Sequence, residues 1–212
     1  MPIDPSSLRK EYTAAGLLEE SAGFDPFALF DRWFHEAVAA EVREPTAMTL
    51  ATSNRQGSPS ARIVLMKGYD ERGIIFYTNY ESHKANDLSE NPQAALLFFW
   101  AELERQVRIE GSITKTSRKE SDEYFQSRPL ESRIGAHASN QSKKIESREV
   151  LTQKVREIEA KFGSSVPIPD QWGGYILNPK KMEFWQGRPA RLHDRILFSK
   201  SDTGWLRERL SP

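Results

Sequence analysis

Five short runs rich in β-branched and aromatic residues lie between residues 46 and 113 of this 212-residue chain. Turn-forming residues separate them, for example at 54–57 and 70–73. Because the connections are short, the runs favour antiparallel hairpins over parallel strands joined by long crossovers. The pattern predicts strands over residues 46–52, 60–66, 74–78, 94–100 and 106–113.

The second of these runs is apolar without alternation, since Ile63, Val64, Leu65 and Met66 follow one another. Such a strand suits a position that is covered on both faces, as in a small barrel. Further strands are expected over residues 174–177, 182–186, 192–198 and 205–209, and helices over residues 82–89, 117–127 and 147–162. The predicted fold class is mainly β with helices (α+β), an antiparallel β-barrel decorated by helices.

Two helices are expected before the first strand. Residues 7–16 form a short polar pattern that ends in a glycine, which indicates a helix polar enough to be mobile. Asp25 and Pro26 are suited to the cap and first turn of a second helix, and Glu44 with the following proline ends it. Its apolar residues recur at helical spacing: Phe27, Phe30, Phe34, Ala37 and Val38. We expect residues 1–20 to be a mobile segment and 21–212 a single domain.

Composition excludes several classes of protein. Lys and Arg together number 30 and so do Asp and Glu, so there is no global basic field for non-specific nucleic-acid binding. No apolar run is long enough to cross a bilayer and no apolar signal core opens the chain, so a cytoplasmic protein without a membrane partner is expected. The absence of cysteine excludes disulfides and thiolate chemistry, and four histidines without a close pair make a metal centre unlikely to form.

The stretch from Glu183 to Arg195 concentrates basic residues after an apolar strand and a Gly/Pro turn. If the exit from the turn is extended, Arg191, His193 and Arg195 share one strand face. Cations that share a face repel one another, so this spacing indicates a phosphate-bearing or electron-rich ligand. A polar edge strand is the alternative, and the spacing does not decide between them.

Two more basic clusters flank expected strands. Arg62 precedes the apolar run and Lys67 closes it, either as ligand-binding groups or as strand ends that reach into solvent. Residues 77–79 lead into His83 and Lys84 at the start of a helix, whose first-turn amides face either an anion or solvent.

Tyr124, Arg128 and Ser132 place two hydroxyls and a guanidinium around a helix end. They suit a phosphate monoester, although they equally suit the carbonyls of the helix terminus. Gln106 alternates with Arg108, and residues 141–144 form a polar loop. Neither glycine-rich phosphate loop occurs, nor does a Gly-x-Ser-x-Gly turn, so the sequence supports neither a Rossmann fold nor an NTPase, and supports hydrolysis poorly.

The chain resembles one family over nearly its whole length, the flavin-dependent pyridoxine (pyridoxamine) 5'-phosphate oxidases. The segments that carry the resemblance are residues 8–12 (LRKEY), 45–48 (PTAM), 62–67 (RIVLMK), 76–79 (FYTN), 104–107 (ERQV), 124–129 (YFQSRP), 141–142 (QS), 172–175 (WGGY) and 185–195 (WQGRPARLHDR).

The resemblance implies a split β-barrel, a homodimer with FMN at the subunit interface, and oxidation of pyridoxine or pyridoxamine 5'-phosphate to pyridoxal 5'-phosphate. In that reaction a hydride passes from C4' to flavin N5, and O2 is reduced to H2O2. The implied flavin contacts are Arg62, Ile63, Val64, Leu65, Met66, Lys67, Tyr77, Thr78, His83, Lys84, Gln106, Gln141, Ser142, Trp185 and Arg195.

The implied substrate contacts are Lys67, Tyr124, Arg128, Ser132, Arg191, Leu192 and His193, together with Arg9, Lys10, Glu11 and Tyr12 of a lid-like N-terminal segment. Arg191 and His193 are the candidate catalytic residues, which orient the C4' substituent and assist loss of its proton. Two phosphate esters, one on each ligand, explain why a neutral chain concentrates cations locally.

The chain departs from the family pattern at His83, where arginine is common, and at Arg133, where glutamine is frequent. A phosphate contact at His83 is expected to be weaker or pH-dependent. Two other functions stay open: a related flavin oxidase of the phenazine-biosynthesis type, and a non-catalytic flavin or pyridoxal-phosphate carrier.

Overall fold

The computed structural model describes residues 11–12 and 16–212. The helix expected over residues 7–16 falls almost wholly outside them. The chain divides into two compact units, the first comprising Met1–Thr49, Leu96–Glu110 and Pro179–Pro212 and the second Leu50–Ala95 and Gly111–Asn178. The strands β5 (Gln93–Trp100), β6 (Arg105–Lys115) and β7 (Trp172–Gln186) have residues in both units.

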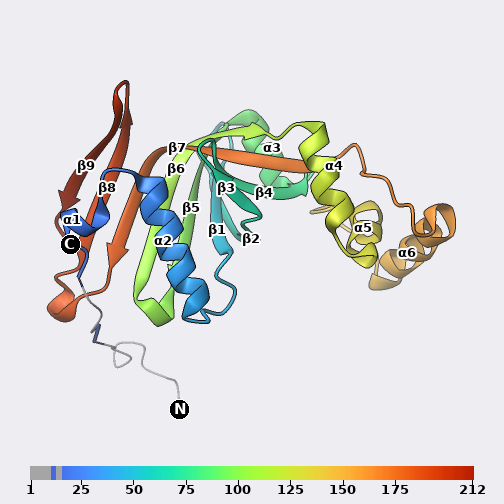
Figure 1. Cartoon of the computed structure of the whole chain (residues 1–212). Helices are drawn as coiled ribbons and strands as arrows, with labels where there is room; N and C mark the ends of the chain where they lie inside the picture. The colour runs from blue at the N-terminus through green and yellow to red at the C-terminus, as the bar shows by residue number, and fades with distance from the viewer. Residues whose placement is uncertain (1–10, 13–15) are drawn as a thin grey trace, which may run out of the picture. The chain divides into compact units, whose positions relative to one another are not determined.

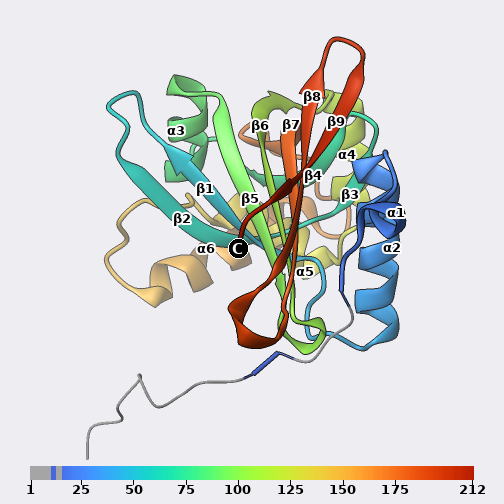
Figure 2. The same cartoon turned by 90° about the vertical axis from the view of Figure 1, so that its left-hand side faces the viewer.

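The first unit contains the helices α1 (Glu19–Ala22) and α2 (Pro26–Ala39) and the strands β8 (Asp194–Ser201) and β9 (Gly204–Leu210). Two 3-10 turns, η2 (Ala101–Leu103) and η3 (Pro189–Arg191), also belong to it. β7 pairs antiparallel with β8, which pairs antiparallel with β9. Figure 2 shows β8 and β9 as a long hairpin.

The helix α2 begins as predicted, because the Asp25 side chain accepts a hydrogen bond of 2.9 Å from the backbone N–H of Phe27. Its buried face packs Phe30 against Phe98, with ring centroids 5.3 Å apart. The predicted end at Glu44 is wrong: the helix ends at Ala39, because Glu41 takes a positive φ of 52°. Val38, expected on the core face, is exposed.

The second unit contains the last four residues of β1 (Ala47–Ser53), the strands β2 (Pro59–Leu65), β3 (Gly68–Asp70) and β4 (Gly73–Asn79), and the helices α3 (His83–Glu90), α4 (Arg118–Ser127), α5 (Leu130–Ala138) and α6 (Arg148–Phe162). Its strands follow the order β2-β1-β5-β6-β7-β4-β3. β4 and β7 are antiparallel, with Phe76 opposite Tyr175. The predicted α+β class with antiparallel strands is confirmed.

The helices α4, α5 and α6 group together in Figure 1. Phe125 and Ile134 are buried there with Val166 and Trp172, and α6 adds partly buried apolar side chains. A capping box opens α4, since the Ser117 hydroxyl accepts from the backbone N–H of Glu120. This helical cluster supports one wall of the site described below.

Four features of individual elements differ from the sequence predictions. β7 is one continuous strand through Pro179 instead of two runs, and α5 and β3 were not expected. The run from Ile63 to Met66 is not covered on both faces: β2 alternates in burial, and Ile63 is 64% exposed. The reason is that β2 stands at the end of the strand order.

Candidate functional site

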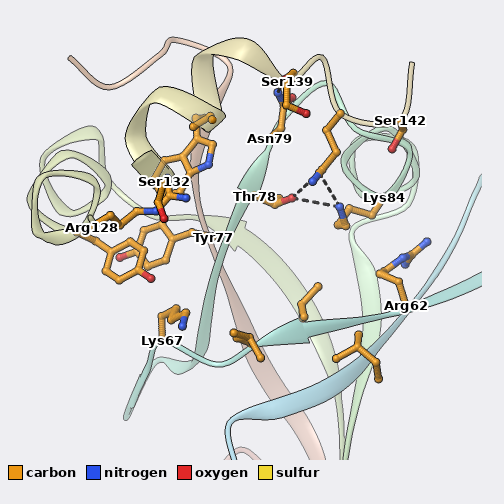
Figure 3. A pocket seen from close by; sticks show the side chains of 18 of the residues that line it. Arg62, Lys67, Tyr77, Thr78, Asn79, Lys84, Arg128, Ser132, Ser139 and Ser142 are labelled. Carbon is orange, nitrogen blue, oxygen red and sulfur yellow. Dashed lines mark hydrogen bonds between the residues drawn. The ribbon is translucent and has the colours of Figure 1, made fainter. Parts of the chain in front are cut away.

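A cavity of about 860 Å³ opens in the second unit, a size typical of small-molecule sites. β2 and β4 supply one part of its lining, and α3, the end of α4, α5 and the following loop supply most of the rest, with Lys67 just after β2 and Trp172 on β7 (Figure 3). The lining residues are Arg62, Ile63, Val64, Leu65, Lys67, Tyr77, Thr78, Asn79, His83, Lys84, Tyr124, Arg128, Ser132, Gly135, Ala136, Ser139, Gln141, Ser142 and Trp172.

Most of the residues that the sequence predicts for ligand contacts in this unit meet in this one cavity. Met66 is the exception, since it is buried and does not line it. The sequence reasoning missed Asn79, Ser139 and Trp172, and also Gly135 and Ala136, which belong to the unexpected helix α5. Asn79 and Trp172 lie inside segments that carry the family resemblance, and this position could have marked them as candidate site residues.

Lys84 marks a polar end of the cavity. Its Nζ donates to Gln141 Oε1 at 2.8 Å, to Thr78 Oγ1 at 3.2 Å and to Ser82 Oγ at 3.4 Å. Figure 3 draws the bond between Lys84 and Thr78. Burial, and secondarily repulsion from the charge of Arg62, lowers the pKa of Lys84 to about 8.

Arg62 lies at the same end and is held by its neighbours. Its Nη1 donates to Thr52 Oγ1 at 2.8 Å and to Leu50 O at 3.1 Å, and its Nη2 lies 4.0 Å from the buried Asp87 carboxylate. His83 Nδ1 lies 3.7 Å from the same carboxylate. Burial lowers the pKa of Arg62. The Asp87 carboxylate thus lies near Arg62 and His83, while Lys84 adds a further cation at this end of the cavity, so this end favours an anion.

A second polar group lies around the end of α4. The rings of Tyr77 and Tyr124 stack with centroids 4.0 Å apart, and Tyr77 also stacks on Trp172 at 5.5 Å. The Arg128 guanidinium lies 4.8 Å from the Trp172 ring centroid. Its Nη1 is buried without a hydrogen-bond partner, and burial lowers the pKa of Arg128. Such a donor is available to an anionic ligand.

The first unit carries the turn between β7 and β8. The extended exit on which a shared strand face depends is absent, and the strand predicted from residue 192 begins later: η3 covers Pro189–Arg191, Ala190 and Arg191 have φ of 54° and 61°, and β8 begins only at Asp194. Arg191 is exposed and does not share a strand face with Arg195. Leu192 is also exposed. The backbone N–H of Arg188 donates to His193 Nδ1 at 3.1 Å.

The cations at this strand are not without an acidic partner, as the sequence pattern had suggested. Glu183 on β7 is 3% exposed and lies between two guanidiniums. Its Oε1 accepts from Arg195 Nε at 2.8 Å, and its Oε2 from Arg108 Nη2 at 2.6 Å. The bond to Glu183 raises the pKa of Arg195. Gln106, half-buried, is on β6 with Arg108.

Tyr12 packs against the same turn. Its ring centroid lies 5.6 Å from that of Trp185 and 5.7 Å from that of His193. A Cβ added to Gly187 would lie 2.8 Å from Tyr12 Cγ, so only glycine leaves room for this contact. Glu11 is exposed, and Arg9 and Lys10 lie outside the described residues.

Among the described residues, no group of three or more acidic or histidine side chains is arranged to hold a metal ion. No helix in the described part of the chain has the length and apolarity needed to cross a bilayer.

Comparisons with known proteins agree with this architecture. Residues 34–162 match the family model of pyridoxamine 5'-phosphate oxidase, and residues 172–212 match that of the pyridoxine 5'-phosphate oxidase C-terminal dimerisation region. A pyridoxine/pyridoxamine 5'-phosphate oxidase of Burkholderia orbicola (strain MC0-3) is 59% identical over 210 residues, which is 98% of each chain.

Two solved structures are similar in fold. PhzG from Burkholderia lata 383, in complex with tetrahydrophenazine-1-carboxylic acid, is 32% identical with a TM-score of 0.89, over 94% of this chain and 99% of PhzG. A pyridoxamine 5'-phosphate oxidase-related, FMN binding protein from Nostoc punctiforme PCC 73102 is 17% identical with a TM-score of 0.72, over 90% of this chain and 99% of its own. These likenesses confirm the predicted split β-barrel decorated by helices. The chain belongs to the pyridoxamine 5'-phosphate oxidase family.

Proposed function

We propose that this protein is an FMN-dependent oxidase that converts pyridoxine 5'-phosphate or pyridoxamine 5'-phosphate to pyridoxal 5'-phosphate and reduces O2 to H2O2. The observation that carries the proposal is a single cavity with two separate anion-binding groups. Figure 3 draws Arg62 and Lys84 on one side of Thr78 and Arg128 with Ser132 on the other. A site for two phosphorylated aromatic ligands needs such an arrangement.

The residues around Lys84 suit the phosphate of FMN. Lys84 is buried and Arg62 is partly buried, and their positive charges repel each other, which a dianion would relieve. We assign the flavin phosphate to this end, with Thr78, Gln141 and Ser142 as hydrogen-bonding neighbours. At the position of His83 the family commonly has arginine, so we propose that His83 is the contact to the flavin phosphate that differs from the family pattern. The flavin contacts Met66, Gln106, Trp185 and Arg195 are carried over from the family resemblance as part of this proposal.

The residues around Arg128 suit the phosphate of the substrate. Arg128 offers a buried donor, Tyr124 and Ser132 offer hydroxyls, and Lys67 adds a second cation. The stacked rings of Tyr77, Tyr124 and Trp172 make this wall rigid. We propose that it binds the phosphate monoester of the vitamin.

When bound, FMN supplies the acceptor for the hydride that leaves C4' and passes both electrons to O2. We propose that Arg191 and His193 orient the C4' substituent and so assist the loss of its proton by position, since His193 Nδ1 already accepts the Arg188 backbone N–H. Arginine is a poor formal base because a guanidinium holds its proton tightly, so Arg191 acts chiefly by position and charge. Leu192 and the segment from Arg9 to Tyr12 complete the proposed substrate contacts.

The match of residues 172–212 to a dimerisation region supports a homodimer. We propose that FMN binds at its subunit interface, that the chain acts on small phosphorylated molecules instead of nucleic acid or membrane, and that it works in the cytoplasm.

The absorbance spectrum of the purified holoenzyme tests the proposal. Anaerobic pyridoxine 5'-phosphate should bleach the oxidised-flavin band, and air should restore it with pyridoxal 5'-phosphate and H2O2 formed. A carrier would bind the phosphate ester without bleaching, and a protein purified without any flavin that also fails to take up added FMN would refute the cofactor.

A second candidate is an oxidase of phenazine precursors, because the PhzG structure is similar over nearly the whole chain. The two functions differ in what Arg128, Tyr124 and Ser132 bind. Turnover of pyridoxine 5'-phosphate with none of tetrahydrophenazine-1-carboxylic acid would favour the first, and the reverse would favour the second.

A further inference from the structure

Asp87 on α3 is a buried acid beside the cations at the Lys84 end of the cavity, and its side chain is 5% exposed. Burying a carboxylate is unfavourable unless hydrogen bonds or opposite charges replace the lost water. Its charged neighbours are not its closest partners, since Arg62 Nη2 lies 4.0 Å and His83 Nδ1 3.7 Å from Oδ2. The closest partner is the Thr52 hydroxyl on β1, which donates to the same oxygen at 2.6 Å.

The Thr52 hydroxyl has a single hydrogen, and its two neighbours decide where that hydrogen points. The Asp87 carboxylate can only accept a hydrogen bond, and the Arg62 guanidinium can only donate. The hydrogen therefore lies on the side of Asp87, and a lone pair of the same oxygen accepts from Arg62 Nη1 at 2.8 Å. A directed chain of hydrogen bonds thus runs from Arg62 through Thr52 to Asp87.

Two more acceptors fix the orientation of the Arg62 guanidinium. Leu50 O accepts from Nη1 at 3.1 Å, and Ser60 Oγ accepts from Nη2 at 2.6 Å. Nε and the second hydrogen of Nη2 have no hydrogen-bond acceptor among the described residues. Arg62 lines the cavity, so these remaining donors are available to a ligand. Burial lowers the pKa of Arg62, and the charge of Asp87 opposes that shift.

The helix α3 places Asp87 one turn after Lys84, so both side chains lie on its buried face. The end of the helix is joined to β1 a second time, because Asn91 Nδ2 donates to Ser53 Oγ at 2.8 Å. All of these residues belong to the second unit. One helix therefore supplies a cation of the site, Lys84, and the acid that fixes another cation, Arg62.

We propose that Asp87 is a positioning residue that, through the Thr52 hydroxyl, orients Arg62 for the phosphate of FMN. The inference rests on the proposed function, in which the flavin phosphate binds at this end. Neither Asp87 nor Thr52 lines the cavity. The direct effect of the Asp87 charge on a phosphate is repulsive, since both are anions. Only the hold on Arg62 can therefore make Asp87 strengthen the binding of FMN.

The test is equilibrium dialysis of FMN against the full-length chain after removal of its flavin. Thr52→Val keeps nearly the same shape without the hydroxyl and should raise the Kd for FMN about tenfold, as expected for a disturbed charged hydrogen bond. Asp87→Ala should raise it to a similar extent. Thr52→Ser, which keeps the hydroxyl, should restore the Kd to within about twofold of wild type. Glu90→Ala removes an exposed acid from the same helix and is the matched control, with a Kd within about twofold of wild type.

An Arg62→Ala background shows whether the pair acts through Arg62. There Thr52→Val and Asp87→Ala should each change the Kd by less than about twofold, because the guanidinium that they orient is absent. A tenfold effect that persists in this background would overturn the proposal. So would an unchanged Kd in both single variants, or tighter binding of FMN by Asp87→Ala. Failure of both single variants to fold would also overturn it, since the pair would then be a requirement of folding.

Failure of the proposed function has a different signature. A wild-type protein that binds FMN and leaves pyridoxine 5'-phosphate unoxidised would refute the oxidase, while the Kd values of the variants would still decide the role of Asp87. A wild-type protein that takes up no FMN would refute both.

Discussion

The Arg128 guanidinium lies over the ring of Trp172, 4.8 Å from its centroid, with Nη1 buried and without a hydrogen-bond partner. The stack fixes the direction of the guanidinium, and the orphaned donor needs an acceptor that the described residues do not supply. Arg128 is therefore the residue at which the proposed substrate phosphate can be tested most directly.

We expect Arg128→Ala to raise the KM for pyridoxine 5'-phosphate by about 10- to 100-fold, the equivalent of about 1.5–3 kcal/mol for a charged hydrogen bond. Steady-state kinetics with the flavin-loaded enzyme measures this. Arg133→Gln is the control, because Arg133 lies on the neighbouring helix and does not line the cavity. An unchanged KM in Arg128→Ala would refute the phosphate assignment.

The lowered pKa of Lys84 predicts pH-dependent binding of FMN. Below pH 8 Lys84 is charged and attracts the phosphate, and above pH 8 the empty site loses this proton. FMN affinity should then fall by up to about tenfold per pH unit between pH 8 and the pKa of the complex. Fluorescence titration of the flavin at several pH values measures this.

The lowered pKa of Lys84 affects the stability of the flavin-free protein in the opposite direction: FMN affinity falls as the pH rises, whereas stability rises. The folded chain releases the Lys84 proton at about pH 8 and the unfolded chain near 10.5, so burying the charged Lys84 costs stability below pH 8, and this cost shrinks as the pH rises across that interval. The variant Lys84→Arg stays charged, so its affinity for FMN should not fall above pH 8 as that of the wild type does. If the variant and wild type show the same pH profile, Lys84 is not the titrating group.

Arg191→Ala should lower kcat by roughly 100-fold, because it removes a positioning charge at the reacting carbon. Stopped-flow reduction of the flavin by pyridoxine 5'-phosphate under anaerobic conditions measures the step directly. Lys200→Ala on β8 is an exposed control of the same type. A raised KM at normal kcat would make Arg191 a binding residue only.

Gly187→Ala should displace Tyr12, because the new Cβ would lie 2.8 Å from Tyr12 Cγ and 3.0 Å from Glu104 Cβ. We expect a KM for pyridoxine 5'-phosphate that is raised about tenfold, in the range of a lost packing contact. In a Tyr12→Ala background, the second change should cost little more. Gly68→Ala, where a Cβ meets ordinary contacts of 3.6 Å, is the control. Additive effects would show that Gly187 acts through Glu104 instead.

Local signals in the sequence predicted the elements that are defined by neighbours along the chain. Asp25 and Pro26 marked the start of α2 because capping needs only residues two or three positions away. The helix α5 was not predicted because it begins directly after Arg128 and Pro129, where a helix end was expected and no separating turn exists.

The site residues show the same limit, because contacts between residues far apart in the sequence could not be predicted. Alternation along one strand suggested unpaired cations, yet the acid that binds Arg195 is Glu183, on the neighbouring strand. Strand register decides that pairing, and register depends on the assembled sheet. The extended exit that a face shared by Arg191 and Arg195 would need does not form, because Ala190 and Arg191 take positive φ angles, which charge spacing does not encode.

The hydrogen bond from the Arg188 backbone to His193 Nδ1 determines the tautomer of the imidazole. A backbone N–H can only donate, so Nδ1 must accept, and the neutral ring carries its proton on Nε2. Under the proposed function, the free edge of His193 offers the substrate a donor and not a lone pair. The C4' hydroxyl of one substrate and the unprotonated amine of the other both have a lone pair to accept it, so a single tautomer serves both.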